Sequence, residues 1–168
     1  MHENIIEALK YTKARYLLAG PCYNPSYLER LKSMEMWNKV DYLGVVSHDK
    51  VKEIYQRSDV GLVLIDYIPN VGYHRGTLGV LKMFEYMMVG IPVIATDLDL
   101  WKEIIEGCGC GICVDPHDVK AIANAINYYL DNPDKAREAG EKGRNAVREK
   151  YNWGTQEIKL LELYDRLL

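Results

Sequence analysis

Short apolar runs alternate along this chain of 168 residues with longer segments in which apolar residues recur every three or four positions. The short runs predict β-strands that are buried on both faces, and the longer segments predict the amphipathic helices that cover them. This alternation is typical of an α/β domain with a parallel sheet. The five predicted strands are residues 15–19, 40–43, 60–65, 92–96 and 111–114.

Residues that favour helix starts precede several of the predicted helices. Pro25 and Pro133 suit the first helical position, and each of them follows an asparagine. Two charged amphipathic helices, residues 133–150 and 155–168, are predicted at the end of the chain, with residues 151–154 as the break between them. The predicted N-caps are Asn24, Ser47, Asp118 and Asn132.

An unusually long connection, residues 66–76, follows the predicted strand 60–65. It contains Tyr73, His74 and Arg75, whose side chains can act on an anion or a sugar. Long connections in compact domains are usually functional, so we expect part of a ligand site here. The alternative for His74 is an exposed loop histidine without a role in binding.

The composition fits one globular domain that buries about 70% of the surface its unfolded chain exposes. Twenty-one Lys and Arg against 24 Asp and Glu give a net charge of −3, which lacks the broad attraction of a basic domain for nucleic acid. The apolar runs fall well short of the ~20 residues of a membrane-spanning helix. The start of the chain has no signal-peptide pattern, and four cysteines are a poor disulfide framework, so we expect reduced thiols and a cytoplasmic location.

Candidate anion-binding chemistry follows the long connection. Gly76 and Gly79 would let a ligand approach the backbone at the start of the next helix, where free N–H groups favour a phosphate. Lys82 would add a positive charge, and Glu85, three residues later, could accept hydrogen bonds from two ribose hydroxyls. The alternative is an ordinary surface ion pair between Lys82 and Glu85.

The segment from Lys82 to Asp97 reads KMFEYMMVGIPVIATD. It resembles the K-x-F-E-Y-M-x-x-G-x-P-V-I-A-T/S donor-binding signature of the group 1, or family 4 type, retaining glycosyltransferases of the GT-B fold. Residues 17–20, 40–44, 47–59 and 111–116 resemble further landmarks of that family, so the similarity extends over nearly the whole chain. The resemblance implies a Rossmann-like three-layer α/β/α domain with a parallel sheet of about five strands, the C-terminal half of a GT-B fold.

The resemblance also implies a function and a set of site residues. The complete enzyme would transfer a hexose from a UDP- or GDP-sugar to an unknown acceptor, in the synthesis of a cell-surface polysaccharide or glycoconjugate. Lys82 and Glu85 match the catalytic positions, with Glu85 holding the ribose, and Gly44 matches the loop beside the base. The residues that match the cradle for the diphosphate and the sugar, or flank it, are His74, Arg75, Gly76, Thr77, Leu78, Gly79 and Val80.

The chain departs from the family pattern at two places. Thr77 stands eight residues before Glu85, where the family's E-x7-E motif has its first glutamate. The other departure is at the start, because the acceptor-binding domain, the first strand and a diphosphate-binding Arg and Lys have no counterpart in residues 1–168. In the family's strand order the absent strand lies between strands 15–19 and 60–65. We expect these two strands to pair directly instead, although insertion of a segment from a neighbouring chain is the alternative.

Other interpretations of the sequence differ in class. Cys108, Cys110, Cys113 and His117 are a candidate zinc set, but their spacing is not that of the common zinc motifs, and small buried cysteines are the plainer interpretation. A nucleotide-sugar epimerase of GT-B fold and a non-catalytic nucleotide-binding module are the rival functions.

The resemblance implies partners as well as chemistry. It requires no metal or cofactor, since the nucleotide sugar is a substrate. The expected partners are that nucleotide-diphosphate sugar and the N-terminal domain of the same enzyme, with no nucleic acid. Peripheral membrane association of the complete enzyme and homo-oligomer formation are left open. The isolated chain is expected to be inactive.

Overall fold

A computed structural model describes residues 1–167 of the chain. The strands are β1 (Tyr16–Ala19), β2 (Val40–Gly44), β3 (Gly61–Val63), β4 (Val93–Thr96) and β5 (Gly111–Val114). The helices are α1 (His2–Ala8), α2 (Pro25–Lys32), α3 (His48–Gln56), α4 (Leu81–Val89), α5 (Asp99–Cys108), α6 (Val119–Asp131), α7 (Pro133–Glu149) and α8 (Trp153–Leu167), and short 3-10 helices lie at Leu9–Tyr11, Glu35–Lys39 and Pro69–Val71.

The predicted order of strands and helices is confirmed, as are most of the predicted helix caps. The side chains of Asn24, Ser47 and Asp118 accept hydrogen bonds from the first turns of α2, α3 and α6. Asn132 precedes α7 but its side chain does not cap that helix; its amide donates to the carbonyl of Tyr128 instead. Asn132 is therefore the N-cap residue of α7, as predicted, but the predicted side-chain hydrogen bond to the first turn is not made.

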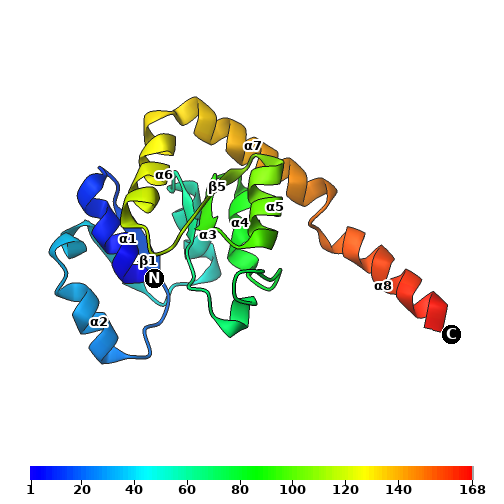
Figure 1. Cartoon of the computed structure of the whole chain (residues 1–168), viewed down its shortest axis with the longest axis horizontal. Helices are drawn as coiled ribbons and strands as arrows, with labels where there is room; N and C mark the ends of the chain where they lie inside the picture. The colour runs from blue at the N-terminus through cyan, green and yellow to red at the C-terminus, as the bar shows by residue number, and fades with distance from the viewer. Residues whose placement is uncertain (168) are drawn as a thin grey trace.

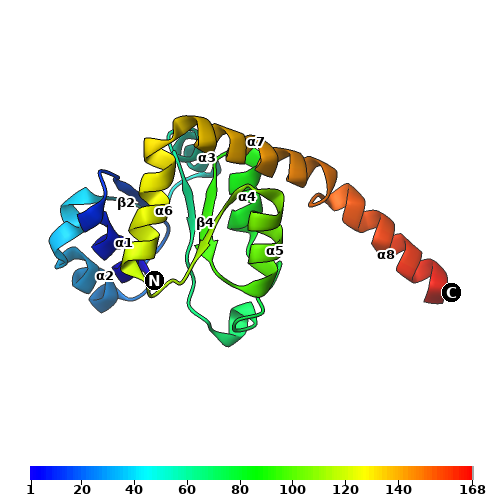
Figure 2. The ribbon, with the colours of Figure 1, turned by 45° about the horizontal axis from the view of Figure 1, so that its top comes forward.

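Helices cover both faces of the strands, which gives the three layers of a Rossmann-like α/β/α fold (Figures 1 and 2). On one face, Leu64 and Ile94 pack with residues of α1 and α6. On the other face, Val63 and Ala95 pack with α4, α5 and α7. Successive residues of a strand point to opposite faces, so the apolar runs are buried from both sides.

The five strands do not form one sheet. Within residues 1–167, β1 pairs only with β2, and β3, β4 and β5 form a second sheet in that order, with every pair parallel. The expectation that strands 15–19 and 60–65 draw together is therefore wrong. Helices α1 and α6 on one face and α3 and α4 on the other line the space between β1 and β3. Among the described residues no strand lies between them.

Helix α1 shows that the two sheets point the same way. Near its start, the side chain of Asn4 donates to the carbonyl of Pro116, just beyond the carboxyl end of β5, at 2.8 Å. Just past its other end, the carbonyl of Leu9 accepts a hydrogen bond from Lys39, which immediately precedes β2, also at 2.8 Å. The helix thus runs from the carboxyl end of one sheet to the amino end of the other, so all five strands run in one direction.

Helix α7 is tightly fitted against the end of α4. A Cβ atom on Gly140 would lie 1.9 Å from the carbonyl oxygen of Gly90, which leaves no room for any side chain there. The guanidinium of Arg144 donates to the carbonyls of Met88 and Val89, which end α4 without helical partners. These contacts fix the carboxyl end of α4.

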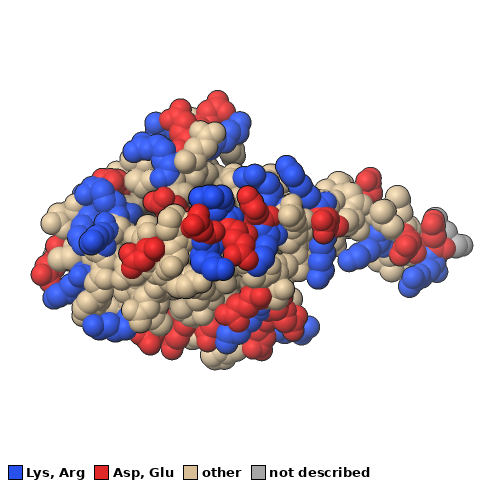
Figure 3. All heavy atoms as spheres, turned by 90° about the horizontal axis from the view of Figure 1, so that it is seen from above, with Lys and Arg blue, Asp and Glu red and all other residues tan. Residues whose placement is uncertain are grey.

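The chain ends in α8, which extends away from the rest of the molecule (Figure 1). This helix starts at Trp153, two residues before the predicted position, because the side chain of Asn152 accepts the N–H of Thr155. None of the helices in the described part of the chain has the length and the apolar character needed to cross a membrane. Acidic and basic side chains are interspersed over the face seen in Figure 3.

Candidate functional site

A large cavity of about 2140 Å³ lies between the two sheets. Four of the predicted site residues line it, all of them on or just before the first turns of α4: Gly79, Val80, Lys82 and Glu85. The volume exceeds the ~300–1,000 Å³ of a typical small-molecule pocket. We therefore take the end of the cavity next to α4 as the candidate site, and the rest of the cavity is the open space between β1 and β3.

Glu85 is held by an aromatic side chain from α3. The hydroxyl of Tyr55 donates to Glu85 Oε2 at 2.7 Å, and the ring of Tyr55 packs edge-on against that of Tyr86. Burial and this hydrogen bond raise the pKa of Tyr55, so the phenol stays a proton donor. The predicted alternative, an ion pair between Lys82 and Glu85, is absent from the ion pairs of residues 1–167.

The start of α4 has unpaired backbone donors. Val80 is the N-cap, and no side chain caps the helix there. Lys82 is exposed in the first turn of the helix, so its ammonium and the free N–H groups lie at the same end of the cavity. A phosphate group placed at this end would meet a positive helix terminus together with a mobile positive charge.

The preceding loop packs against α5 rather than lining the cavity. The carbonyls of His74 and Arg75 accept the N–H groups of Asp99 and Leu100 at the start of α5, each at 2.9 Å. The indole of Trp101 donates to the carbonyl of Thr77 at 2.8 Å. The structure thus separates this part of the predicted site from the four predicted residues that line the cavity; the separated residues are His74, Arg75, Gly76, Thr77 and Leu78.

Gly76 has a structural reason to be glycine. Its φ of +86° is rarely adopted by other residues, and a Cβ atom there would lie 3.1 Å from the Cβ of Leu98. The close approach predicted for a ligand is therefore made by α5. At Gly79 a Cβ would meet only the hydroxyl of Thr77, at 3.7 Å, so the space beside this glycine is open, while its N–H donates to that same hydroxyl at 3.3 Å.

The side chain of His74 belongs to a second polar cluster, beyond the strand ends. Its ring lies 4.2 Å from that of Tyr67, whose hydroxyl donates to Asp97. Burial raises the pKa of Asp97, but the hydrogen bonds from Tyr67 and Lys102 outweigh it, and the net pKa is lowered. Asp97 therefore stays ionised as an acceptor, and the ring of His74 is stacked in place.

Gly44 lies at the end of β2, away from the cavity. Its φ of +61° turns the chain, its carbonyl accepts the N–H of Gly20 at 2.8 Å, and a Cβ atom there would meet nothing within 4 Å. The space beside Gly44 is thus open.

Tyr55 could not be found from the sequence, because it precedes Glu85 by 30 residues and no spacing pattern links the two.

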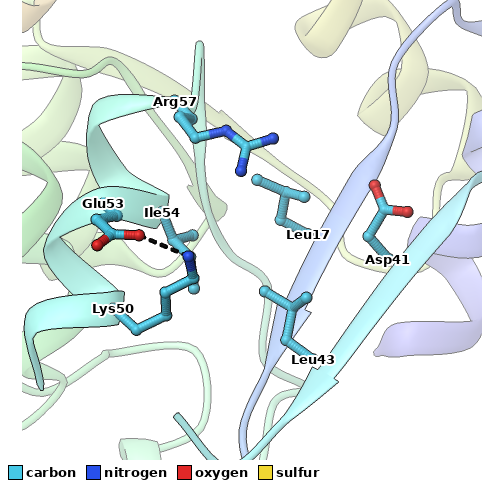
Figure 4. Close-up of a pocket in the computed structure, with 7 residues that line it drawn as sticks. All are labelled: Leu17, Asp41, Leu43, Lys50, Glu53, Ile54 and Arg57. Carbon is cyan, nitrogen blue, oxygen red and sulfur yellow. Dashed lines mark hydrogen bonds and ion pairs between the residues drawn. The ribbon is translucent and has the colours of Figure 1, made fainter. Parts of the chain in front are cut away.

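A smaller pocket of about 380 Å³ lies between α3 and the β1–β2 pair (Figure 4). Leu17, Leu43 and Ile54 form its apolar walls, and Lys50 on α3 is paired with Glu53. None of the predicted site residues lines this pocket, and it is distinct from the end of the large cavity at α4.

Three of the four cysteines, Cys108, Cys110 and Cys113, lie in or against the core. Cys110 is fully buried against α7, where a Cβ on Gly143 would lie 3.2 Å from its own Cβ. Burial raises the pKa of Cys110 and of Cys113 to about 12, so both remain thiols at neutral pH. Neither thiol is therefore a ready thiolate ligand for zinc.

Relatives of this chain are glycosyltransferases of larger size. It is 27% identical over 157 residues to an uncharacterized glycosyltransferase of Methanocaldococcus jannaschii, covering 93% of this chain and 38% of the relative. It is 26% identical over 140 residues to a GDP-mannose-dependent alpha-(1-6)-phosphatidylinositol monomannoside mannosyltransferase of Mycobacterium tuberculosis, covering 81% of this chain and 36% of that enzyme. The chain thus spans less than half the length of either relative.

The fold matches solved structures as well. A sucrose-phosphate synthase from Thermosynechococcus elongatus, a GT-B glycosyltransferase, superposes with a TM-score of 0.79 at 24% identity, covering 98% of this chain and 41% of that protein. The family model described as glycosyl transferases group 1 matches residues 1–146. Because that match includes both sheets and the KMFEYM segment, this chain belongs to the group 1 glycosyltransferases.

Proposed function

We propose that this chain is the donor-binding half of a retaining hexosyltransferase that uses a UDP- or GDP-sugar. The observation that carries the proposal is the arrangement at α4. Lys82 and the uncapped helix start face the cavity, and Glu85 is held beside them by Tyr55. A nucleoside diphosphate has the two matching features, a doubly charged diphosphate and a ribose with two vicinal hydroxyls.

In this proposal, the N–H of Val80 and the ammonium of Lys82 bind the diphosphate. The N–H of Gly79, which donates to the hydroxyl of Thr77 at 3.3 Å, would join them by exchanging that hydroxyl for a phosphate oxygen. When the bond between the sugar and the diphosphate breaks, negative charge grows on the leaving phosphate oxygen. The same groups then interact more strongly than they did with the intact donor, which is how a binding site lowers a barrier. No residue described here acts as a general base for the acceptor.

Glu85 orients the nucleotide in this proposal. Its Oε2 already accepts the hydroxyl of Tyr55, which leaves the remaining lone pairs of the carboxylate for the two ribose hydroxyls. Gly44 lies at the end of β2 outside the cavity lining, and the proposal assigns the base to the open space beside it. His74 and Arg75, which flank the cradle, would contact the sugar only if the loop moved away from α5.

The acceptor side would come from a second domain. The chain spans only 36–41% of the relatives and the solved structure to which it was compared. We therefore propose that the 168-residue chain alone binds a nucleoside diphosphate weakly and transfers no sugar. A cytoplasmic location and a role in glycoconjugate synthesis belong to the same proposal.

Calorimetry with UDP, GDP and ADP tests the proposal and identifies the base. Glu85→Gln should weaken nucleotide binding by about 1–3 kcal/mol, since a charged acceptor of two hydroxyls is replaced by a neutral one. Lys82→Ala should weaken binding of the diphosphate but not of the free nucleoside. The matched control is Lys50→Ala, which removes a lysine from the smaller pocket.

Two results would overturn the proposal. Unchanged nucleotide affinity in both variants would show that Lys82 and Glu85 are surface residues without a role in binding. Nucleotide binding without any sugar transfer by the two-domain enzyme would favour a non-catalytic module. Interconversion of the donor sugar without an acceptor would instead favour a nucleotide-sugar epimerase.

A further inference from the structure

The side chain that holds Glu85 comes from a stripe of α3 that faces the candidate site. His48, Val51 and Tyr55 line the cavity that also holds the start of α4. Their spacing of three and four residues places them on one face of the helix. Tyr55, the last of the three, therefore belongs to the wall of the candidate site as well as to the contact between the two helices.

The ring of Tyr55 is fixed relative to the sheet through Tyr86. A Cβ atom on Gly61, the first residue of β3, would overlap the ring of Tyr86, so the strand begins with glycine where that ring crosses it. The rings of Tyr86 and Tyr55 meet edge to face with their centroids 5.3 Å apart, an arrangement that aromatic pairs favour. The hydroxyl of Tyr55 is thus held by packing, and the exposed side chain of Glu85 takes its position from that hydroxyl.

The hydrogen bond from Tyr55 orients Glu85 without neutralising it. A phenol donates one hydrogen and carries no charge, whereas a lysine or an arginine at this place would cancel the negative charge of the carboxylate. Of the roughly four acceptor sites of a carboxylate, Tyr55 occupies one, on Oε2. The other sites stay available in a fixed plane, and the rotatable bonds of Glu85 no longer have to be ordered when a ligand binds.

We propose that Tyr55 is a positioning residue that gives the candidate site its selectivity for ribose over 2′-deoxyribose. This inference rests on the proposed function, in which Glu85 accepts both vicinal hydroxyls of the ribose. A carboxylate held in one orientation can meet both hydroxyls at once, but it cannot turn to improve a bond to a single one. A nucleotide that lacks one hydroxyl then leaves an acceptor without a partner, which is how polar sites reject such analogues. A carboxylate that is free to rotate would lose this penalty.

Affinities of the 168-residue chain for paired nucleotides test the role of Tyr55. UDP and GDP are each compared with their 2′-deoxy forms by calorimetry. For the base that binds, we expect the natural chain to favour the ribose form by about tenfold or more, as for one hydrogen bond to a charged group. In Tyr55→Phe, which keeps the ring, this preference should fall to about threefold or less, because the ribose form loses most of its advantage. A preference that stays the same in Tyr55→Phe would overturn the inference.

A second phenol–carboxylate pair supplies the matched control. The hydroxyl of Tyr67 donates to Asp97 at 2.5 Å, and neither of these two residues lines the cavity. Tyr67→Phe should therefore leave the ratio of the two affinities unchanged. An equal loss of preference in Tyr67→Phe and Tyr55→Phe would overturn the inference, since the effect would then come from a general change in the fold.

Replacing Tyr55 by p-aminophenylalanine separates the hydrogen bond from the packing of the ring. The amino group is a neutral donor near the place of the hydroxyl, so the preference for ribose should return. The inference is overturned if the preference stays at the level of Tyr55→Phe while the melting temperature matches that of the natural chain. The bond to Glu85 would then have no part in selectivity.

The contact itself is measured without a nucleotide. Burial, and after it the hydrogen bond to Glu85, raise the pKa of Tyr55 in the free chain. NMR of the chain labelled at the tyrosine ζ carbons should show this pKa falling in Glu85→Gln. An unchanged pKa would overturn the inference, since Tyr55 would then not touch the carboxylate.

The inference and the proposed function fail in different ways. If neither nucleotide binds although the contact is present, the proposed function fails and the inference fails with it. If a nucleotide binds and Glu85→Gln weakens it, but Tyr55→Phe leaves the ribose preference unchanged, only the inference fails.

Discussion

Strands β1 and β4 are both parallel, both four residues long and both apolar in sequence, yet their surroundings differ. β4 has a partner on each side, and all four of its residues are buried. β1 has one partner, and none of its residues reaches full burial. The comparison shows that an apolar run specifies a strand, whereas burial depends on neighbours that the run does not encode.

The largest effect is expected where the three-stranded sheet is closest packed. A Cβ on Gly111 would lie 2.0 Å from the carbonyl oxygen of Val93 in β4. We expect Gly111→Ala to lower the free energy of unfolding by about 3 kcal/mol, since backbone must move to accommodate it. Urea denaturation measures this loss. Gly107→Ala is the control, because a Cβ there meets nothing within 4 Å, and it should cause no loss.

A smaller effect is expected at the corresponding place in the two-stranded sheet. Gly44 has open space around it, so Gly44→Ala introduces only the cost of its φ of +61°, about 1–2 kcal/mol. Gly44→Asn should cost less, because asparagine tolerates this conformation. A loss as large as that of Gly111→Ala would show that the two sheets are equally close packed and would break the comparison.

The smallest effect is expected at His2, which packs against the two-stranded sheet. Nδ1 of His2 and the hydroxyl of Tyr16 in β1 share a hydrogen bond of 3.0 Å, and the ring of His2 also lies near that of Tyr27 in α2. Burial is the main cause of its lowered pKa, and the positive charges of the amino terminus and Lys82 add to it, against Glu3. The unfolded chain therefore binds a proton more readily than the folded chain does.

Because the pKa of His2 is lower in the folded chain, neutral His2 contributes stability above about pH 6.5. That contribution is lost as the pH falls below 6.5. One proton limits the slope to about 1.4 kcal/mol per pH unit. Urea denaturation between pH 5 and 7 should show the free energy of unfolding falling with pH, by less than this limit, in the natural chain and falling less in His2→Gln. Identical slopes in the two proteins would place the titration elsewhere.

Much of the fold could be predicted from the sequence because it is encoded locally. The strand at Gly111–Val114 and the caps Asn24, Ser47 and Asp118 follow from apolar runs and from side chains adjacent to the backbone they cap. The separation of the two sheets could not be predicted, because the path of β1 relative to β3 depends on α1, α3, α4 and α6 together.

The candidate site divides in the same way. Lys82 and Glu85 could be identified from one helical turn, and both do line the cavity. The contact of Glu85 with Tyr55 and the packing of Gly76 against Leu98 join residues more than 20 positions apart, and no local pattern signals them. Gly76 illustrates the limit, since a glycine forced by packing and a glycine needed by a ligand have the same letter in the sequence.

The attachment of α4 to α7 has a mechanical consequence. Gly140 and Arg144 hold the carboxyl end of α4, so any tilt of this helix would pivot near Gly90. The nine residues of α4, at about 1.5 Å each, make the helix about 13 Å long. A tilt of about 10° would then displace the start of α4 by about 2 Å while Met88 and Val89 stay in place. Such a tilt would also have to repack Met83, which is fully buried in the first turn, and adjustment to an occupant of the cavity would be concentrated at the end that carries Lys82.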